Sequence, residues 1–124
     1  MVAPFVHKNI DFSKDSKLLE IGCGVGAQIR IICRKYPQLA VSGIDISDKQ
    51  IRRAQHLLGK EIANGRVFLD VGSADRLPYD DEEFDVVFIC FVLEHLDNPS
   101  SAVAEAMRVL KKGGKVICLS LIHI

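Results

Sequence analysis

The sequence predicts an α/β fold in which a mostly parallel sheet carries helices on both of its faces. Three observations predict it. Short apolar strands alternate with amphipathic helical segments, the first strand runs into a glycine-rich turn at residues 22–26, and residues 84–91 are apolar apart from Asp85, as in a strand buried on both faces. The chain of 124 residues is long enough for one domain with one core.

The first half of the chain reads as two strand-to-helix units after a lead-in at residues 1–16. A strand at 17–21 precedes a helix at 27–36, which aligns Ile29, Ile32, Cys33 and Tyr36 on one face and which Pro37 ends. A second strand at 40–46 follows, with Asp45 at its carboxyl end. Ser47 and Gln50 then form a capping box for one helix with an apolar stripe. We expect that stripe to be Ile51, Ala54, Leu58 and Ile62, and the helix to stop at Asn64-Gly65.

The second half continues the alternation. A short strand at 66–71 leads through a polar, acidic loop at 72–83 into the buried strand at 84–91. Asn98 is placed to cap a helix that starts at Pro99 and that Gly113-Gly114 ends. A fifth strand follows at 115–121. We expect the buried stripe of this helix to be Val103, Ala106, Met107 and Leu110.

Composition gives no support to several classes of function. Lys plus Arg and Asp plus Glu both number 16, so no global charge favours nucleic acid or an anionic membrane. The four cysteines lack the paired spacing of a metal site or a redox disulfide, and we expect them to be buried apolar residues in a reducing compartment. The longest apolar run falls well short of the roughly 20 residues that span a bilayer, and the N-terminus has no signal-peptide core. We therefore expect a cytoplasmic protein.

Several polar or flexible segments are predicted to meet at the carboxyl ends of the strands, which we call the rim. In open parallel sheets a ligand binds there, where the strand order reverses. The prediction brings together the glycine turn, Asp45, the loop at 73–75 and the segment after Phe88. Glycine lets a ligand approach the backbone closely, and a helix N-terminus offers N–H groups to it. We therefore expect a nucleotide-like cofactor site at the rim.

Asp45 strengthens this interpretation because it lies 19 positions after Gly26. An acid about 20 residues beyond the glycines binds ribose hydroxyls in dinucleotide sites, and a carboxylate can accept two hydroxyls at once. Gly22-x-Gly24-x-x-Ala27 also fits the dinucleotide fingerprint, so a nicotinamide-dependent oxidoreductase is an open alternative. A turn without a ligand, and an acid that only caps a helix, are the structural alternatives.

The order of the motifs resembles the class I S-adenosylmethionine-dependent methyltransferases, specifically the type 11 methyltransferase domain. The resemblance covers residues 18–119. Six motifs carry it, in chain order: EIGCGVG at 20–26, GIDIS at 43–47, ADRLPY at 74–79, FDVV at 84–87, LEHL at 93–96 and LKKGG at 110–114. It implies a three-layer Rossmann-like fold and S-adenosyl-L-methionine as the cofactor, with 17–124 as the cofactor-binding domain.

The resemblance also implies roles for individual residues. Glu20 and the glycine turn would hold the methionine amino and carboxylate groups, Asp45 the ribose, and Ile46 the adenine ring. Asp75 would accept from the adenine amino group, with Ala74 beside it, and Cys90 and Phe91 would border the cofactor. From the residues alone, Asp75 could equally be a solvated loop acid, and Cys90 and Phe91 plain core. The cofactor contacts expected in full are Glu20, Gly22, Cys23, Gly24, Gly26, Asp45, Ile46, Ala74, Asp75, Cys90 and Phe91.

The reaction implied is transfer of a methyl group to a small-molecule or lipid-like acceptor. His95 is the candidate base because imidazole titrates near neutrality, and Glu94 could orient it. Both could instead belong to a helix-entry loop. A domain that binds the cofactor or a protein partner without catalysis is the third alternative. No residue pattern indicates a metal.

The family pattern continues beyond the fifth strand with a helix and two further strands. This chain lacks strands 6 and 7 of that pattern, so we expect a C-terminally incomplete domain. The apolar fifth strand would then be an exposed edge of the sheet, which favours pairing with another chain. We expect the isolated chain to self-associate, and a monodisperse monomer in light scattering at high concentration would contradict this.

Overall fold

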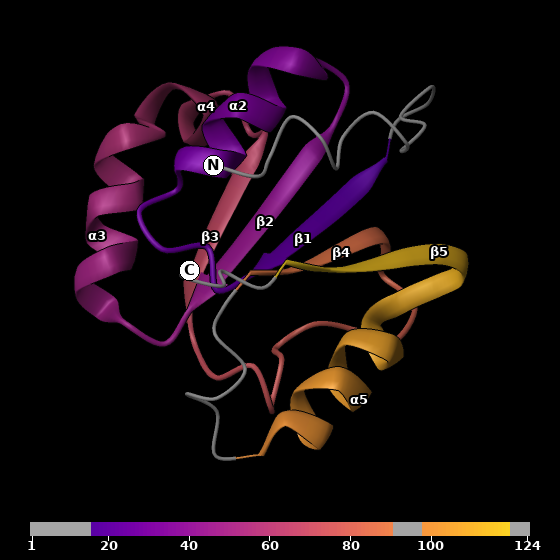
Figure 1. Ribbon diagram of the computed structural model, residues 1–124. Helices are drawn as coiled ribbons and strands as arrows, with labels where there is room; N and C mark the ends of the chain where they lie inside the picture. Colours follow the sequence, from indigo (N-terminus) through magenta and orange to yellow (C-terminus); the bar gives the residue numbers. More distant parts are fainter. Residues whose placement is uncertain (1–15, 91–97, 120–124) are drawn as a thin grey trace.

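The fold is taken from a computed structural model, which describes residues 16–90 and 98–119. Its elements alternate as predicted (Figure 1). They are β1 (Lys17–Ile21), α2 (Ala27–Lys35), β2 (Ala40–Asp45), α3 (Asp48–Leu57), α4 (Gly59–Ala63), β3 (Val67–Val71), β4 (Phe84–Cys90), α5 (Pro99–Val109) and β5 (Leu110–Leu119).

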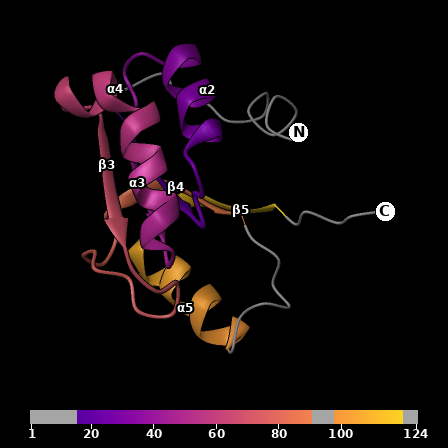
Figure 2. The same ribbon diagram turned by 90° about the vertical axis from the view of Figure 1, so that its left-hand side faces the viewer.

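The five strands form one parallel sheet in the order β3-β2-β1-β4-β5. β1 lies at its centre, and the strand order reverses between β1 and β4. Helices α2, α3 and α4 cover one face, and α5 packs on the other (Figures 1 and 2). The predicted three-layer α/β architecture is therefore confirmed.

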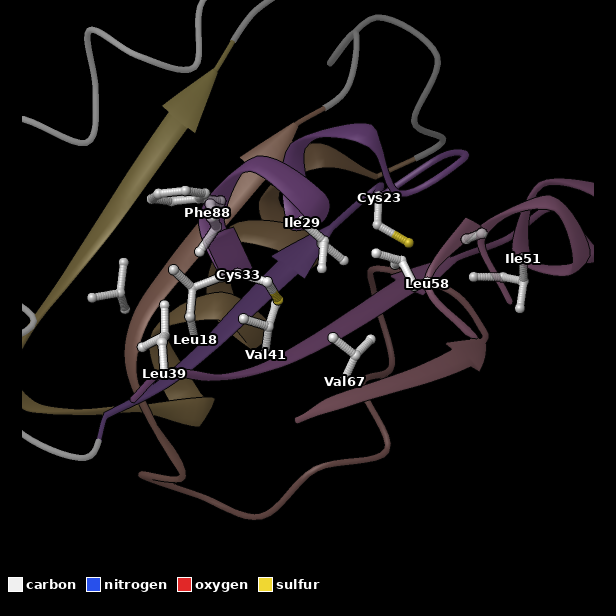
Figure 3. Close-up of a cluster of buried hydrophobic side chains, with 13 residues drawn as sticks. Leu18, Cys23, Ile29, Cys33, Leu39, Val41, Ile51, Leu58, Val67 and Phe88 are labelled. Carbon is white, nitrogen blue, oxygen red and sulfur yellow. The ribbon is translucent and has the colours of Figure 1, made fainter. Parts of the chain in front are cut away.

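Two apolar clusters, one on each face, join the layers. Successive strand residues point to opposite faces, so Leu18 enters one cluster and its neighbour Leu19 the other. The first cluster contains Leu18 of β1, Ile29 of α2 and Ile51 of α3 (Figure 3). The second packs Leu19 and Phe84 against Ala106 of α5. β1 is thus buried on both sides from Leu18 to Ile21, as expected of a central strand in a sheet with helices on both faces.

Both predicted N-caps form, but the predicted capping box at Ser47 is half made, because the Ser47 N–H donates to Asp45 Oδ1 and the buried Gln50 Oε1 accepts no hydrogen bond. The Ser47 side chain accepts a hydrogen bond from the Gln50 N–H at 3.2 Å. The Asn98 side chain accepts from the Ser101 N–H at 3.2 Å, and Pro99 opens α5. Each cap satisfies a donor that the first helical turn leaves without a partner inside the helix.

The single helix predicted after Ser47 is wrong, because the structure divides it at Leu58. The backbone at Leu58 departs from helical geometry, with φ −103° and ψ 21°, and Gly59 opens α4. Leu58 is fully buried beneath the glycine turn, whereas Ile62 is 36% exposed. The change of direction therefore keeps Leu58 in the core and turns Ile62 out of the predicted stripe.

The predicted stripe of the last helix is also partly wrong. Val103 is 43% exposed and Met107 is 57% exposed, while the buried residues are Ala102, Ala106 and Val109. These three lie four and then three positions apart, so they form one helical row. Small side chains in that row let α5 lie close to the sheet, and the neighbouring row with Val103 and Met107 faces outward.

The Gly113-Gly114 pair does not end α5; it lies within β5, which starts at Leu110. Leu110 pairs with Phe84, whereas Lys115 pairs with Val86, so β5 holds extra residues at this point. Gly113 has φ +81°, and a Cβ on Gly114 would lie 2.7 Å from the Asp85 carbonyl oxygen. The two glycines therefore make a bulge against β4.

The position of β5 at the edge of the sheet is as predicted, and self-association through it stays a prediction. Cys118 on this strand is exposed, so the expectation that it is buried is wrong; an edge strand has a neighbour on one side alone. Cys23 and Cys33 are buried, as expected. Among the described residues, no helix has both the length and the apolar character to cross a membrane.

Candidate cofactor site

The glycine turn, residues 22–26, joins β1 to α2 and is held by backbone hydrogen bonds. Gly22, Gly24 and Gly26 have φ of 80°, 56° and 84°, in the left-handed region that favours glycine. The N–H groups of Gly22 and Cys23 donate to the Ile44 carbonyl at 2.8 and 3.1 Å. The turn is therefore fixed to the carboxyl end of β2.

Two of these glycines are required for different reasons. A Cβ on Gly26 would lie 2.8 Å from Leu58 Cδ1 and 3.2 Å from Ala54 Cβ, so the turn packs directly on α3. A Cβ on Gly24 would meet nothing within 4 Å. Gly24 thus borders open space, where a ligand can come close to the backbone.

Asp45 lies beside Gly24, as the sequence predicts. Its Oδ2 accepts from the Gly24 N–H and its Oδ1 accepts from the Ser47 N–H, both at 2.9 Å. A carboxylate has about four lone-pair sites, so each oxygen keeps one for a further donor. Asp45 therefore fastens the glycine turn to the start of α3 and can still accept from a pair of hydroxyl groups.

Glu20, the last but one residue of β1, is 2% exposed. Its Oε2 accepts from Gln28 Nε2 at 2.6 Å, so the first turn of α2 contributes to the same region. Gln28 is not among the site residues predicted from the sequence. The only signal for it was its position in the first helical turn after the glycines, which many sequences fill with unrelated side chains.

The Cys23 side chain points away from the rim into the first apolar cluster, beside Leu58 (Figure 3). Burial, together with the negative charges of Glu20 and Asp45, raises the pKa of its thiol to about 12. Cys23 is therefore a neutral packing residue, and any contact it makes with a cofactor is through its backbone. The Glu20 and Asp45 carboxylates, the smaller causes of this shift, place negative charge near the turn, which favours a cationic ligand.

The loop at residues 72–79, which we call the Asp75 loop, begins at the same rim. The Gly72 N–H donates to the Asp45 backbone carbonyl at 3.0 Å, which ties the ends of β2 and β3 together. The Ser73 hydroxyl donates to the exposed Asp75 carboxylate, and Ala74 packs against the second apolar cluster. Ile46, which follows Asp45, is 75% exposed. An apolar side chain so exposed beside Asp45 is available to cover a flat ring.

Two side chains of α5 hold the Asp75 loop, and neither was predicted from the sequence. Glu105 Oε1 accepts from the Leu77 N–H at 2.9 Å, and Arg108 donates to the carbonyls of Leu77 and Tyr79 at 3.0 and 2.9 Å. Arg108 Nε also donates to Glu105 Oε2 at 2.7 Å. This hydrogen bond is the main reason that the pKa of Glu105 is lowered. We call this pair the α5 clamp.

The structure describes the other predicted site residues only in part or does not describe them. Cys90 ends β4, next to β1 at the rim, but its side chain lies outside the described part of the chain. Phe91, Glu94 and His95 also lie outside the described residues. Within the ranges 16–90 and 98–119, no group of three or more His, Cys, Asp or Glu side chains is arranged to bind a metal ion.

A separate groove of about 710 Å³ runs along β3, between this strand and helices α3 and α4. None of the predicted site residues lines it. The lining residues are Gln55, Gly59, Ile62, Val67, Phe68, Leu69 and Asp70. The groove is therefore distinct from the rim.

Comparison with known proteins gives one family. The family model described as "Methyltransferase domain" matches residues 19–118. Ajmaline N-methyltransferase of Rauvolfia serpentina is 34% identical over 110 residues, which are 89% of this chain and 38% of that protein. The ubiquinone/menaquinone biosynthesis C-methyltransferase UbiE of Desulfotalea psychrophila is 33% identical over 103 residues, 83% of this chain and 40% of that protein. The chain spans about two fifths of the length of these relatives.

Solved structures agree on the fold. The [4+2]-cyclase SpnF matches with a TM-score of 0.80 and 27% identity, over 89% of this chain and 40% of its own. YcgJ from Bacillus subtilis matches with a TM-score of 0.84 and 24% identity, over 95% of this chain and 49% of its own. Since a protein described as a cyclase shares this architecture, the fold alone does not determine the reaction.

Proposed function

We propose, since this chain belongs to the methyltransferase domain family, that it binds S-adenosyl-L-methionine at the rim for methyl transfer to a small-molecule or lipid-like acceptor. The observation that carries the proposal is the Asp45 carboxylate, held by the N–H groups of Gly24 and Ser47 with an acceptor site left on each oxygen. A ribose diol offers two adjacent hydroxyl donors, which match these two sites.

The other rim residues fit the remaining parts of this cofactor. Glu20 is buried and is bound by Gln28 in the first turn of α2. Its carboxylate suits the amino group of methionine, and the N–H groups at the start of α2 suit the methionine carboxylate. The exposed Ile46 side chain would cover the adenine, and Asp75 would accept from its amino group. The negative charges of Glu20 and Asp45 near the turn suit a ligand with a positive sulfonium.

Bound S-adenosyl-L-methionine would supply an electrophilic methyl group on its sulfonium sulfur. The task of the protein is then mostly to align the two reactants and to exclude water. We propose His95 as the residue that takes a proton from the acceptor, with Glu94 to orient it. One relative is named for N-methylation of ajmaline and the other for a C-methylation in ubiquinone/menaquinone biosynthesis, which supports a small-molecule acceptor here.

Calorimetric titration with S-adenosylhomocysteine and, separately, with NAD tests the proposal. We expect micromolar binding of S-adenosylhomocysteine and weaker binding of NAD. Asp45→Ala should weaken the first by about 1.5–3 kcal/mol, the range for hydrogen bonds to a charged group. Asp48→Ala is the matched control, because Asp48 is an exposed acid three positions away that pairs with Arg52 on α3.

Asp45 also accepts two backbone N–H groups, so Asp45→Ala could lower the stability of the fold. Asp45→Asn keeps one acceptor oxygen and should bind with intermediate affinity, and thermal unfolding of each variant shows whether it is folded. A preference for NAD would favour the oxidoreductase alternative. No binding of S-adenosylhomocysteine by folded wild-type protein would contradict the proposed function.

A further inference from the structure

We propose that Glu105 and Arg108, the α5 clamp, are positioning residues that set how the Asp75 loop presents Asp75 to the adenine of the cofactor. This inference rests on the proposed function, since it assumes that Asp75 accepts from the adenine amino group. It assigns a role at the site to two side chains that lie on a helix on the other face of the sheet from α2 and α3.

Few hydrogen bonds between backbone atoms within the Asp75 loop fix its conformation. The Gly72 N–H at its start donates to the Asp45 carbonyl at 3.0 Å, and the Glu82 N–H, three residues beyond its end, donates to the Arg108 carbonyl at 2.9 Å. Between them, the backbone hydrogen bond that joins two loop residues runs from Arg76 N–H to Ser73 at 3.3 Å, which is long. The conformation of this stretch therefore depends on side chains that reach it from elsewhere.

The α5 clamp binds the loop backbone at three polar atoms. The N–H and C=O of Leu77 are held by Glu105 and Arg108, and the C=O of Tyr79 by Arg108. Arg108 also pairs with Asp81 at 2.7 Å. Leu77 lies two residues after Asp75, and its side chain is 4% exposed in the second apolar cluster. Fixing both polar atoms of Leu77 therefore fixes where the chain at Asp75 emerges at the rim.

The chemistry of the pair suits this role. The guanidinium of Arg108 is planar and carries several donors in a fixed fork, so one side chain spans two loop carbonyls and the Glu105 carboxylate. The Arg108 and Glu105 side chains are 32% and 21% exposed, so water competes with them only in part. A lysine could not reproduce this pattern, because its ammonium is a single point of charge.

The test compares S-adenosylhomocysteine with its hypoxanthine counterpart, S-inosylhomocysteine, in which a carbonyl replaces the adenine amino group. We expect wild-type protein to prefer the adenine ligand by about tenfold, as for a hydrogen bond to a carboxylate. Arg108→Met should reduce this ratio to about two or less. Arg52→Met on α3 is the matched control, because it removes an exposed arginine with one carboxylate partner, and should leave the ratio unchanged.

Three further measurements separate positioning from general stability. In an Asp75→Asn background, Arg108→Met should have no further effect on the ratio. Amide hydrogen exchange without ligand should show faster exchange at Leu77 in Arg108→Met than in Arg52→Met. Arg108→Lys, which keeps the charge, should behave like Arg108→Met. If Arg108→Met does not fold, Glu105→Gln serves in its place, since it removes the charged acceptor of the Leu77 N–H.

The outcomes distinguish this inference from the function on which it rests. If wild-type protein binds S-adenosylhomocysteine and folded Arg108→Met keeps the full preference for adenine, the positioning role is overturned and the proposed function stands. If folded wild-type protein binds neither ligand, both are overturned. A lost preference with unchanged exchange at Leu77 would also contradict the positioning role.

Discussion

The two sides of the rim are built by different means. The glycine turn is held by hydrogen bonds between backbone atoms and by three residues with positive φ, whereas the Asp75 loop is held by side chains that reach it from α5. The first side is therefore sensitive above all to the volume of an added side chain. The second is sensitive to charge and to pH. One site can thus be damaged in two physically distinct ways.

The largest effect is expected from Gly26→Val, which tests the steric side of this comparison. A valine at φ +84° is strained, and its Cβ would overlap Leu58 Cδ1, so we expect the free energy of unfolding to fall by about 2–5 kcal/mol. Denaturant unfolding measures this loss. Gly65→Val is the control for strain alone, because Gly65 has φ +74° with open space around it. Equal losses in the two variants would show that packing of the turn on α3 does not matter.

A smaller effect is expected from Glu105→Gln, which tests the charged side. The variant loses a charge-assisted hydrogen bond to Arg108, so we expect about 1.5–3 kcal/mol less stability at pH 7. The folded-state pKa of Glu105 is lowered below 4.5. Its contribution is therefore fully present above pH about 4.5 and is lost as the pH falls through the folded value.

Unfolding of wild type and Glu105→Gln between pH 7 and pH 3 measures this dependence. The difference between the two proteins should shrink in acid. Glu82→Gln, at an exposed glutamate near the end of the same loop, is the matched control and should show a small and constant difference. A difference for Glu105→Gln that is the same at pH 3 and pH 7 would contradict the charged nature of the clamp.

The smallest effect is expected from Met107→Gln, on the outward face of α5. Met107 is 57% exposed, so the free energy of unfolding should change by less than about 0.5 kcal/mol. Thermal unfolding and the adenine preference described above should both match those of wild type. A loss comparable with that of Glu105→Gln would show that α5 acts through more than its loop-facing side.

The parts of this fold that sequence reasoning predicted are those set by local chemistry. Alternating strands and helices, the caps at Ser47 and Asn98, and the juxtaposition of the glycine turn with Asp45 all follow from short-range patterns and from the topology of parallel sheets. The wrong predictions concern positions where two local arrangements fit the sequence pattern almost equally well and tertiary packing decides between them. Val103 and Ala106 both fit an apolar stripe, and the close approach of α5 to the sheet selected the smaller one.

The α5 clamp could not be predicted for a related reason. Glu105 and Arg108 are 28 to 31 residues from the loop atoms they bind, and in the sequence they look like an ordinary ion pair on the surface of a helix. Gln28 presents the same difficulty. A charged or polar side chain is typical of many exposed helical positions, and its partner becomes known only once the chain is folded.

The central place of β1 in the sheet also sets the order in which the chain can fold. β1 pairs with β2 across one helical connection, but its other neighbour, β4, is far along the sequence: the Lys17 N–H donates to the Asp85 carboxylate across 68 positions. Closing so long a loop costs chain entropy before any contact compensates for it. The segment from β1 to β3 can therefore assemble first as the chain emerges from the ribosome. The edge of β1 that pairs with β4 then has no strand neighbour until β4 has been synthesised.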